Sequence, residues 1–94
     1  MNRITERDLA GVCRRINRLT KSPEAPYAKS ADGERMVAQI GNYHISHQYG
    51  GVSLHRMVSE GGGVSDVLMC GHVPKRELYT AMHAFIRGME TRDT

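Results

Sequence analysis

The chain has 94 residues, of which 39% are hydrophobic and 24% are charged, and its formal net charge at pH 7 is +3. A chain of this length supports one hydrophobic core but not two, so we expect a single domain over 1–94 and, because the core is small, a homo-oligomer. No apolar run reaches the about 18 residues of a membrane-spanning helix, and the charged N-terminal segment is unlike a signal peptide. These features predict a cytoplasmic protein that does not enter a membrane.

The first predicted element is a helix from about Thr5 to Thr20. Thr5 is placed as its N-cap, with Asp8 three residues later, and Ile4 and Leu9 are spaced as a hydrophobic staple. An apolar stripe follows the helical period at Leu9, Val12, Cys13, Ile16 and Leu19. A basic stripe lies opposite, at Arg7, Arg14, Arg18 and Lys21, and is expected to face water or to bind nucleic acid weakly. Cys13 is expected to be a buried, reduced thiol.

Residues 22–34 are predicted to be a connecting loop, because two prolines stop the helix and Asp32-Gly33 forms a turn. A short edge strand fits within this loop at Tyr27 to Ser30.

Three strands are predicted next, at 35–40, 43–49 and 52–59, with turns at Gly41-Asn42 and Gly50-Gly51. This register pairs Ile40 with Tyr43 and Tyr49 with Val52. The face toward the helices then carries Met36, Ala38, Ile40, Tyr43, Ile45, Tyr49, Val52, Leu54 and Val58. The opposite face is polar but nearly uncharged, which suits a partner subunit or a polar ligand.

Two polar residues, His47 and Arg56, fall on the predicted apolar face. An unpaired buried charge is costly, so Arg56 is expected to meet an anion. Three arrangements fit: an ion pair with Asp66 or Glu60, a bound phosphate or carboxylate, and a β-bulge that turns Arg56 outward.

After a glycine-rich loop at 61–63, a fourth strand is predicted between Val64 and Cys70. Pro74 then opens a second helix, whose apolar stripe includes Leu78, Met82, Phe85 and Met89, and the tail 91–94 is expected to be frayed. The fold class is therefore α+β, with an N-terminal helix, a three- to four-stranded antiparallel β-meander and a C-terminal helix.

A phosphate-binding site is predicted around the start of the second helix. Lys75 and Arg76 lie in its first turn, where cations oppose the helix dipole unless an anion is near. His72 and the glycine loop precede them, and glycine backbones approach phosphates closely. The full set of predicted ligand-binding residues adds base stacking and further polar contacts: Arg56, His72, Lys75, Arg76, Tyr43, Tyr49, Tyr79, His44 and His55.

Catalysis and metal binding are the weaker interpretations of the same residues. The predicted register places Ser46 opposite His55, so His44, Ser46 and His55 could act as acid and base in phosphodiester cleavage, but no carboxylate is expected on that face. The five histidines show none of the usual zinc-ligand spacings, so neither a metal nor a cofactor is predicted.

Three segments resemble small uncharacterised proteins of tailed bacteriophages: RINRLTKSP (15–23), GNYHISHQYGGVSLHRMVSEGGGVSDV (41–67) and GHVPKRELY (71–79). The resemblance implies synthesis in the cytoplasm of an infected bacterium but no established activity. Phage proteins that are this small, mildly basic and glycine- and tyrosine-bearing look like anti-defence factors. The mild basic charge favours sequestration of a nucleotide immune signal, such as a cyclic oligonucleotide or an ADP-ribose derivative. The alternatives are a protein-interaction module that blocks a host defence protein and a weak nucleic-acid-binding protein.

Overall fold

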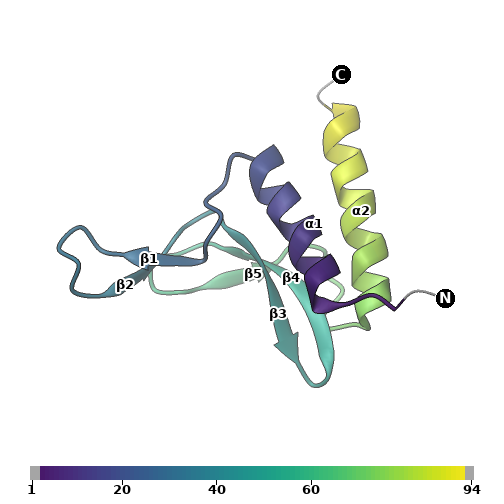
Figure 1. Ribbon diagram of the computed structural model, residues 1–94, viewed down its shortest axis with the longest axis horizontal. Helices are drawn as coiled ribbons and strands as arrows, with labels where there is room; N and C mark the ends of the chain where they lie inside the picture. Colours follow the sequence, from purple (N-terminus) through teal and green to yellow (C-terminus); the bar gives the residue numbers. More distant parts are fainter. Residues whose placement is uncertain (1–2, 93–94) are drawn as a thin grey trace.

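The computed structural model describes residues 3–92 as two helices and five short strands. In chain order these are α1 (Glu6–Leu19), β1 (Tyr27–Lys29), β2 (Met36–Ala38), β3 (Tyr43–Gln48), β4 (Gly51–Met57), β5 (Val64–Asp66) and α2 (Lys75–Arg92). The strands form two antiparallel sheets, a β3-β4-β5 meander and a separate β1-β2 ribbon (Figure 1). The α+β class and the order of helix, antiparallel strands and helix are therefore confirmed.

Helix α1 begins where its capping signal predicts. The Thr5 hydroxyl accepts a hydrogen bond from the Asp8 N–H at 3.2 Å, and the Asp8 carboxylate accepts one from the Thr5 N–H at 2.9 Å. This reciprocal pair satisfies two N–H groups that a helix end leaves without partners. The buried residues of α1 include Leu9, Val12, Cys13 and Ile16, as predicted, whereas Leu19 is 42% exposed.

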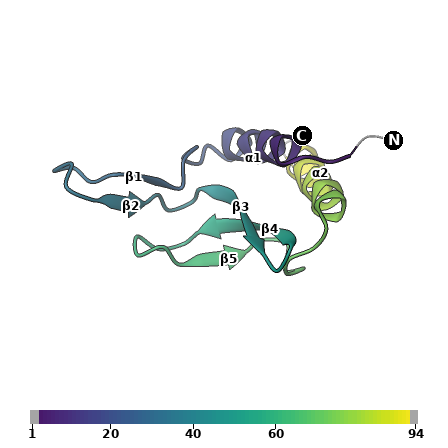
Figure 2. The same cartoon turned by 60° about the horizontal axis from the view of Figure 1, so that its bottom comes forward.

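Both helices lie on one face of the meander and leave its opposite face without a helix (Figure 2). The core between them combines Leu9 and Ile16 of α1 with Leu78, Met82 and Ile86 of α2. The sheet contributes residues of its predicted apolar face: Tyr43, Ile45, Val52 and Leu54. The assignment of sheet faces is therefore confirmed for β3 and β4.

The hairpin between β3 and β4 turns one residue earlier than predicted. Gln48 pairs with Gly51, and the turn residues are Tyr49 and Gly50, whose φ angles of 53° and 76° suit a type I′ turn. The predicted register was wrong by two residues, so Ser46 lies opposite Ser53 rather than His55. Gly51 is instead a strand residue, paired with Gln48, and glycine fits there because a Cβ would lie 3.0 Å from the His72 carbonyl carbon.

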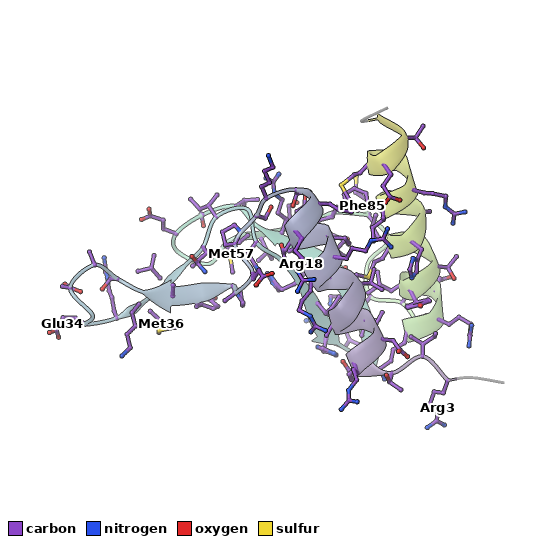
Figure 3. All side chains as sticks on the ribbon, turned by 45° about the horizontal axis from the view of Figure 1, so that its top comes forward. Arg3, Arg18, Glu34, Met36, Met57 and Phe85 are labelled. Carbon is purple, nitrogen blue, oxygen red and sulfur yellow. The ribbon has the colours of Figure 1, made fainter. Side chains whose placement is uncertain are left out.

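The predicted pairing of 35–40 with 43–49 was also wrong. The side-chain amide of Asn17 already occupies the Tyr43 backbone groups that Ile40 would have needed, at 2.8 and 2.9 Å. Strand β2 pairs with β1 instead, so the edge strand predicted in the 22–34 loop exists as Tyr27–Lys29. Four residues assigned to the core face are more than half exposed: Met36, Ile40, Tyr49 and Val58. Figure 3 shows Met36 on the projecting β1-β2 ribbon, away from both helices.

The C-terminal half follows the prediction more closely. Strand β5 confirms the start of the predicted fourth strand but ends at Asp66, and α2 begins immediately after Pro74. Of the tail expected to be frayed, 91 and 92 belong to α2 and 93–94 lie outside the described residues. Within the described part of the chain, neither helix combines the length and apolar character needed to cross a membrane.

Candidate functional site

A row of three histidines lies on the sheet face that carries no helix. His44 on β3 and His55 on β4 are directly paired, with ring centroids 6.0 Å apart. His72, from the segment before α2, approaches His55 with a centroid distance of 5.7 Å. All three side chains are half-buried. We call these three residues the histidine row.

The position of His72 depends on two backbone contacts. Val73 pairs with Val52 through hydrogen bonds of 2.8 and 2.9 Å, which directs its neighbour His72 to the opposite face. The absent side chain of Gly51 allows this close approach. His72 Nε2 then lies 3.0 Å from the Ser46 hydroxyl oxygen. The row is therefore assembled from segments up to 28 residues apart, between 44 and 72.

Asp66 anchors the loop that leads to His72. Its carboxylate accepts hydrogen bonds from the Ser53 hydroxyl at 3.1 Å and from the N–H groups of Met69 at 3.2 Å and Gly71 at 2.9 Å. Asp66 also pairs with His55 across β4 and β5, so this polar face does carry a carboxylate. The expectation that it would not was wrong, because the fourth strand brings Asp66 beside the row.

Burial disfavours a positive charge on two of the three imidazoles, those of His44 and His55. Desolvation lowers the pKa of His44, and the neighbouring His55 lowers it further. Desolvation also lowers the pKa of His55, partly opposed by the Asp66 carboxylate, while His72 adds to the lowering. At neutral pH these two imidazoles are therefore mostly uncharged. A ligand anion would reverse that balance, because an opposite charge favours the protonated imidazole.

Arg56 and Tyr43 form a second small cluster on the other face. The Arg56 guanidinium carbon lies 5.4 Å from the centre of the Tyr43 ring, which is a cation–π distance. Arg56 is exposed and forms no ion pair with Asp66 or Glu60 among the described residues, so the predicted structural pair was wrong.

The other predicted site residues lie apart from both clusters. Lys75 forms an ion pair of 3.5 Å with Glu6, and Arg76 is exposed in the first turn of α2. Tyr79 packs edge-on against His83, and Tyr49 is 94% exposed at the hairpin tip. Lys75 lies two residues after Val73, which pairs with Val52, and Arg56 lies four residues along β4 from Val52, about 13 Å of strand. Among the described residues, Lys75 and Arg56 are therefore too far apart to bind one phosphate.

The glycine loop at 61–63 connects β4 to β5 near Arg56, at the other end of the meander from α2. The predicted combination of this loop with the start of α2 therefore does not form. Among the described residues, no three His, Cys, Asp or Glu side chains gather in a way that could hold a metal ion. Cys13 and Cys70 are both free thiols, and burial raises the pKa of Cys13 to about 11.

Comparison with models of known protein families, with characterised proteins and with solved structures gives no match for this chain. The functional argument therefore depends on the geometry of the histidine row. The sequence predicted His44 and His55 on one face of the sheet and placed His72 with a different group, before the second helix. Ser53 was not predicted as part of a site, and Asp66 was predicted only as a possible partner of Arg56, because their location on predicted strands was their only other sequence signal.

Proposed function

We propose that this protein binds a small phosphorylated nucleotide on the outer face of its three-stranded sheet and holds it without chemical change. The observation that carries this proposal is the convergence of His44, His55 and His72 in one row. Three of the predicted ligand-binding residues contribute to the row, and they come from three different segments of the chain.

The chemistry of the row suits a phosphate group. A neutral imidazole donates one hydrogen bond and a protonated imidazole donates two, so the row gains both charge and donors when it takes up protons. The hydroxyl of Ser46, next to His72, adds another polar group on the same face. Because burial lowers the pKa of His44 and His55, phosphate binding should be coupled to proton uptake and should be tighter at acidic pH.

The resemblance to small phage proteins supports a biological setting for this activity. In that setting the protein acts in the cytoplasm of an infected bacterium and sequesters a nucleotide immune signal, either a cyclic oligonucleotide or an ADP-ribose derivative. Self-association, expected from the small core, would place several such faces in one assembly.

A thermal-shift screen tests the proposal with defined probes: cyclic di-GMP, cyclic tri-AMP and ADP-ribose, each at about pH 6 and about pH 8. We expect one probe to raise the Tm by several degrees, with the larger rise at the lower pH. His55→Gln should remove most of that rise, because His55 contacts both other histidines. His83→Gln is the matched control, because His83 lies on α2 against Tyr79.

The screen also separates the histidine row from the site predicted around Arg56. If the nucleotide binds at the histidine row, Arg56→Ala should keep the rise in Tm. Loss of the rise in Arg56→Ala but not in His55→Gln would show that the nucleotide binds on the other face, at Arg56. Absence of any response in the parent protein would contradict nucleotide binding. Each mixture is then analysed by chromatography. A hydrolysed nucleotide would contradict sequestration and indicate catalysis at the Ser46–His72 pair.

A further inference from the structure

Strand β3 is an edge strand, and one of its outward backbone positions is already occupied by a side chain. The Asn17 amide donates to the Tyr43 carbonyl at 2.9 Å and accepts from the Tyr43 N–H at 2.8 Å. This pair of bonds copies what a neighbouring strand would make. Tyr43 therefore directs its backbone groups away from β4.

Alternation along the strand gives Ile45 and His47 the same outward direction. The hydrogen bonds of β4 support this direction. Val52 lies opposite His47 and bonds to Val73 on the side away from β3, so the backbone groups of His47 point away from β4. Among the described residues, nothing hydrogen-bonds to the outward backbone groups of Ile45 and His47. Natural edges are commonly protected by lysine, proline or a bulge, and β3 carries none of these devices. Four main-chain hydrogen-bonding groups are thus open along this edge.

A groove of about 420 Å³ runs beside this edge, with α1 as its second wall. The helix contributes Ala10, Cys13 and Arg14, and the strand contributes Tyr43 and Ile45. A strand edge next to a helix wall is the arrangement in which an extended peptide adds to a sheet, with its main chain on the strand and its side chains in the groove.

Charge distinguishes between two occupants of the groove, a foreign peptide and a second copy of β3. Glu6 is paired with His47 and Lys75, and Glu24 is paired with Arg18, whereas no carboxylate among the described residues pairs with Arg14. Strand β3 itself, YHISHQ, contains no acidic residue, so a second copy would leave Arg14 without an anion.

We infer that the β3 edge and the α1 groove bind an extended acidic peptide segment of another protein, which adds as a strand opposite Ile45 and His47. The segment places a carboxylate against Arg14 and a small apolar side chain against Ala10 and Cys13. His44 of the histidine row also lines the groove, but the peptide would bind the main chain of β3 at Ile45 and His47, whereas the nucleotide would bind the imidazole groups of the row.

Selection from a displayed library of random heptapeptides tests the inference, followed by synthesis of the consensus peptide. We expect acidic consensus sequences, and we expect the synthetic peptide to slow amide hydrogen exchange at Ile45 and His47 in the full chain. N-methylation of alternate peptide bonds in the ligand should abolish binding, because main-chain hydrogen bonds hold it. Arg14→Gln should weaken binding about fivefold, whereas a peptide with its acidic residue amidated should bind both proteins equally.

Arg18→Gln is the matched control, since Arg18 is an exposed arginine on the same helix that pairs with Glu24. Its peptide affinity should equal that of the parent protein. Failure to select any peptide, or peptide binding that leaves the Ile45 and His47 amides exchanging freely, would overturn the inference. Protection of those amides that rises with protein concentration in the absence of peptide would show that a second copy occupies the edge instead.

Discussion

The buried amide of Asn17 should be among the most sensitive positions in the fold. Asn17 is 2% exposed, and its side chain joins α1 to the first residue of β3 through both backbone groups of Tyr43. Asn17→Ala removes this connection without adding charge or bulk. The Tyr43 carbonyl keeps a contact with the Cys13 thiol at 3.1 Å, so the N–H is the group left without a partner.

The expected cost follows from these two bonds. A buried donor without a partner costs about 1–3 kcal/mol, and the lost packing of a small side chain adds about 1 kcal/mol. We therefore expect Asn17→Ala to lower the free energy of unfolding by about 2–4 kcal/mol. For a small domain this is a large share of the total, which is typically about 5–15 kcal/mol.

Urea unfolding monitored by circular dichroism measures this cost, provided that the transition is two-state. Arg14→Ala is the control, because Arg14 is exposed on the same helix and should change the free energy of unfolding by less than about 0.5 kcal/mol. A cost for Asn17→Ala no greater than that of the control would refute the role given to the amide.

Three further predictions concern the sheet. Gly51→Ala should destabilise the fold by about 1–3 kcal/mol in urea unfolding, because the new Cβ would lie 3.0 Å from the backbone carbon of His72; an unchanged midpoint would contradict this close contact. Tyr49→Asn should stabilise the fold by about 0.5–1 kcal/mol, because Tyr49 is 94% exposed with a φ of 53°, and a lower Tm would count against it. Folding lowers the pKa values of His44 and His55, so the unfolded chain binds more protons at acidic pH, and the free energy of unfolding should fall as the pH is lowered below about 6.5. His55→Gln should weaken this pH dependence in urea unfolding measured at several pH values. An equal pH dependence in the variant and the parent protein would exclude His55 as its source.

Sequence patterns predicted the features of this fold that depend on neighbouring residues. The capping residues of α1 and the proline before α2 are local signals, and both helices begin where these signals lie. The faces of β3 and β4 were also correct although the register was wrong by two residues. A slip by an even number leaves every side chain on its original face, so hydrophobic alternation alone could not reveal the error.

The features that could not be predicted from the sequence depend on contacts between residues far apart in the chain. The bond from Asn17 to Tyr43 joins positions 26 residues apart and excludes Ile40 from the sheet. Polar alternation had placed His44 and His55 on one face, but His72 joins them only through the bridge between Val52 and Val73. No local pattern encodes either contact, because each depends on how the helices and the meander pack together.

A histidine titration by NMR tests the nucleotide site most directly. The imidazole signals of the full chain are followed from about pH 5 to about pH 8, with and without the nucleotide that raises the Tm most. We predict that the pKa values of His44 and His55 are lower than the ordinary histidine value in the free protein and that the nucleotide raises both of them. Unchanged titration of His44 and His55 in the presence of a bound nucleotide would contradict the proposed site.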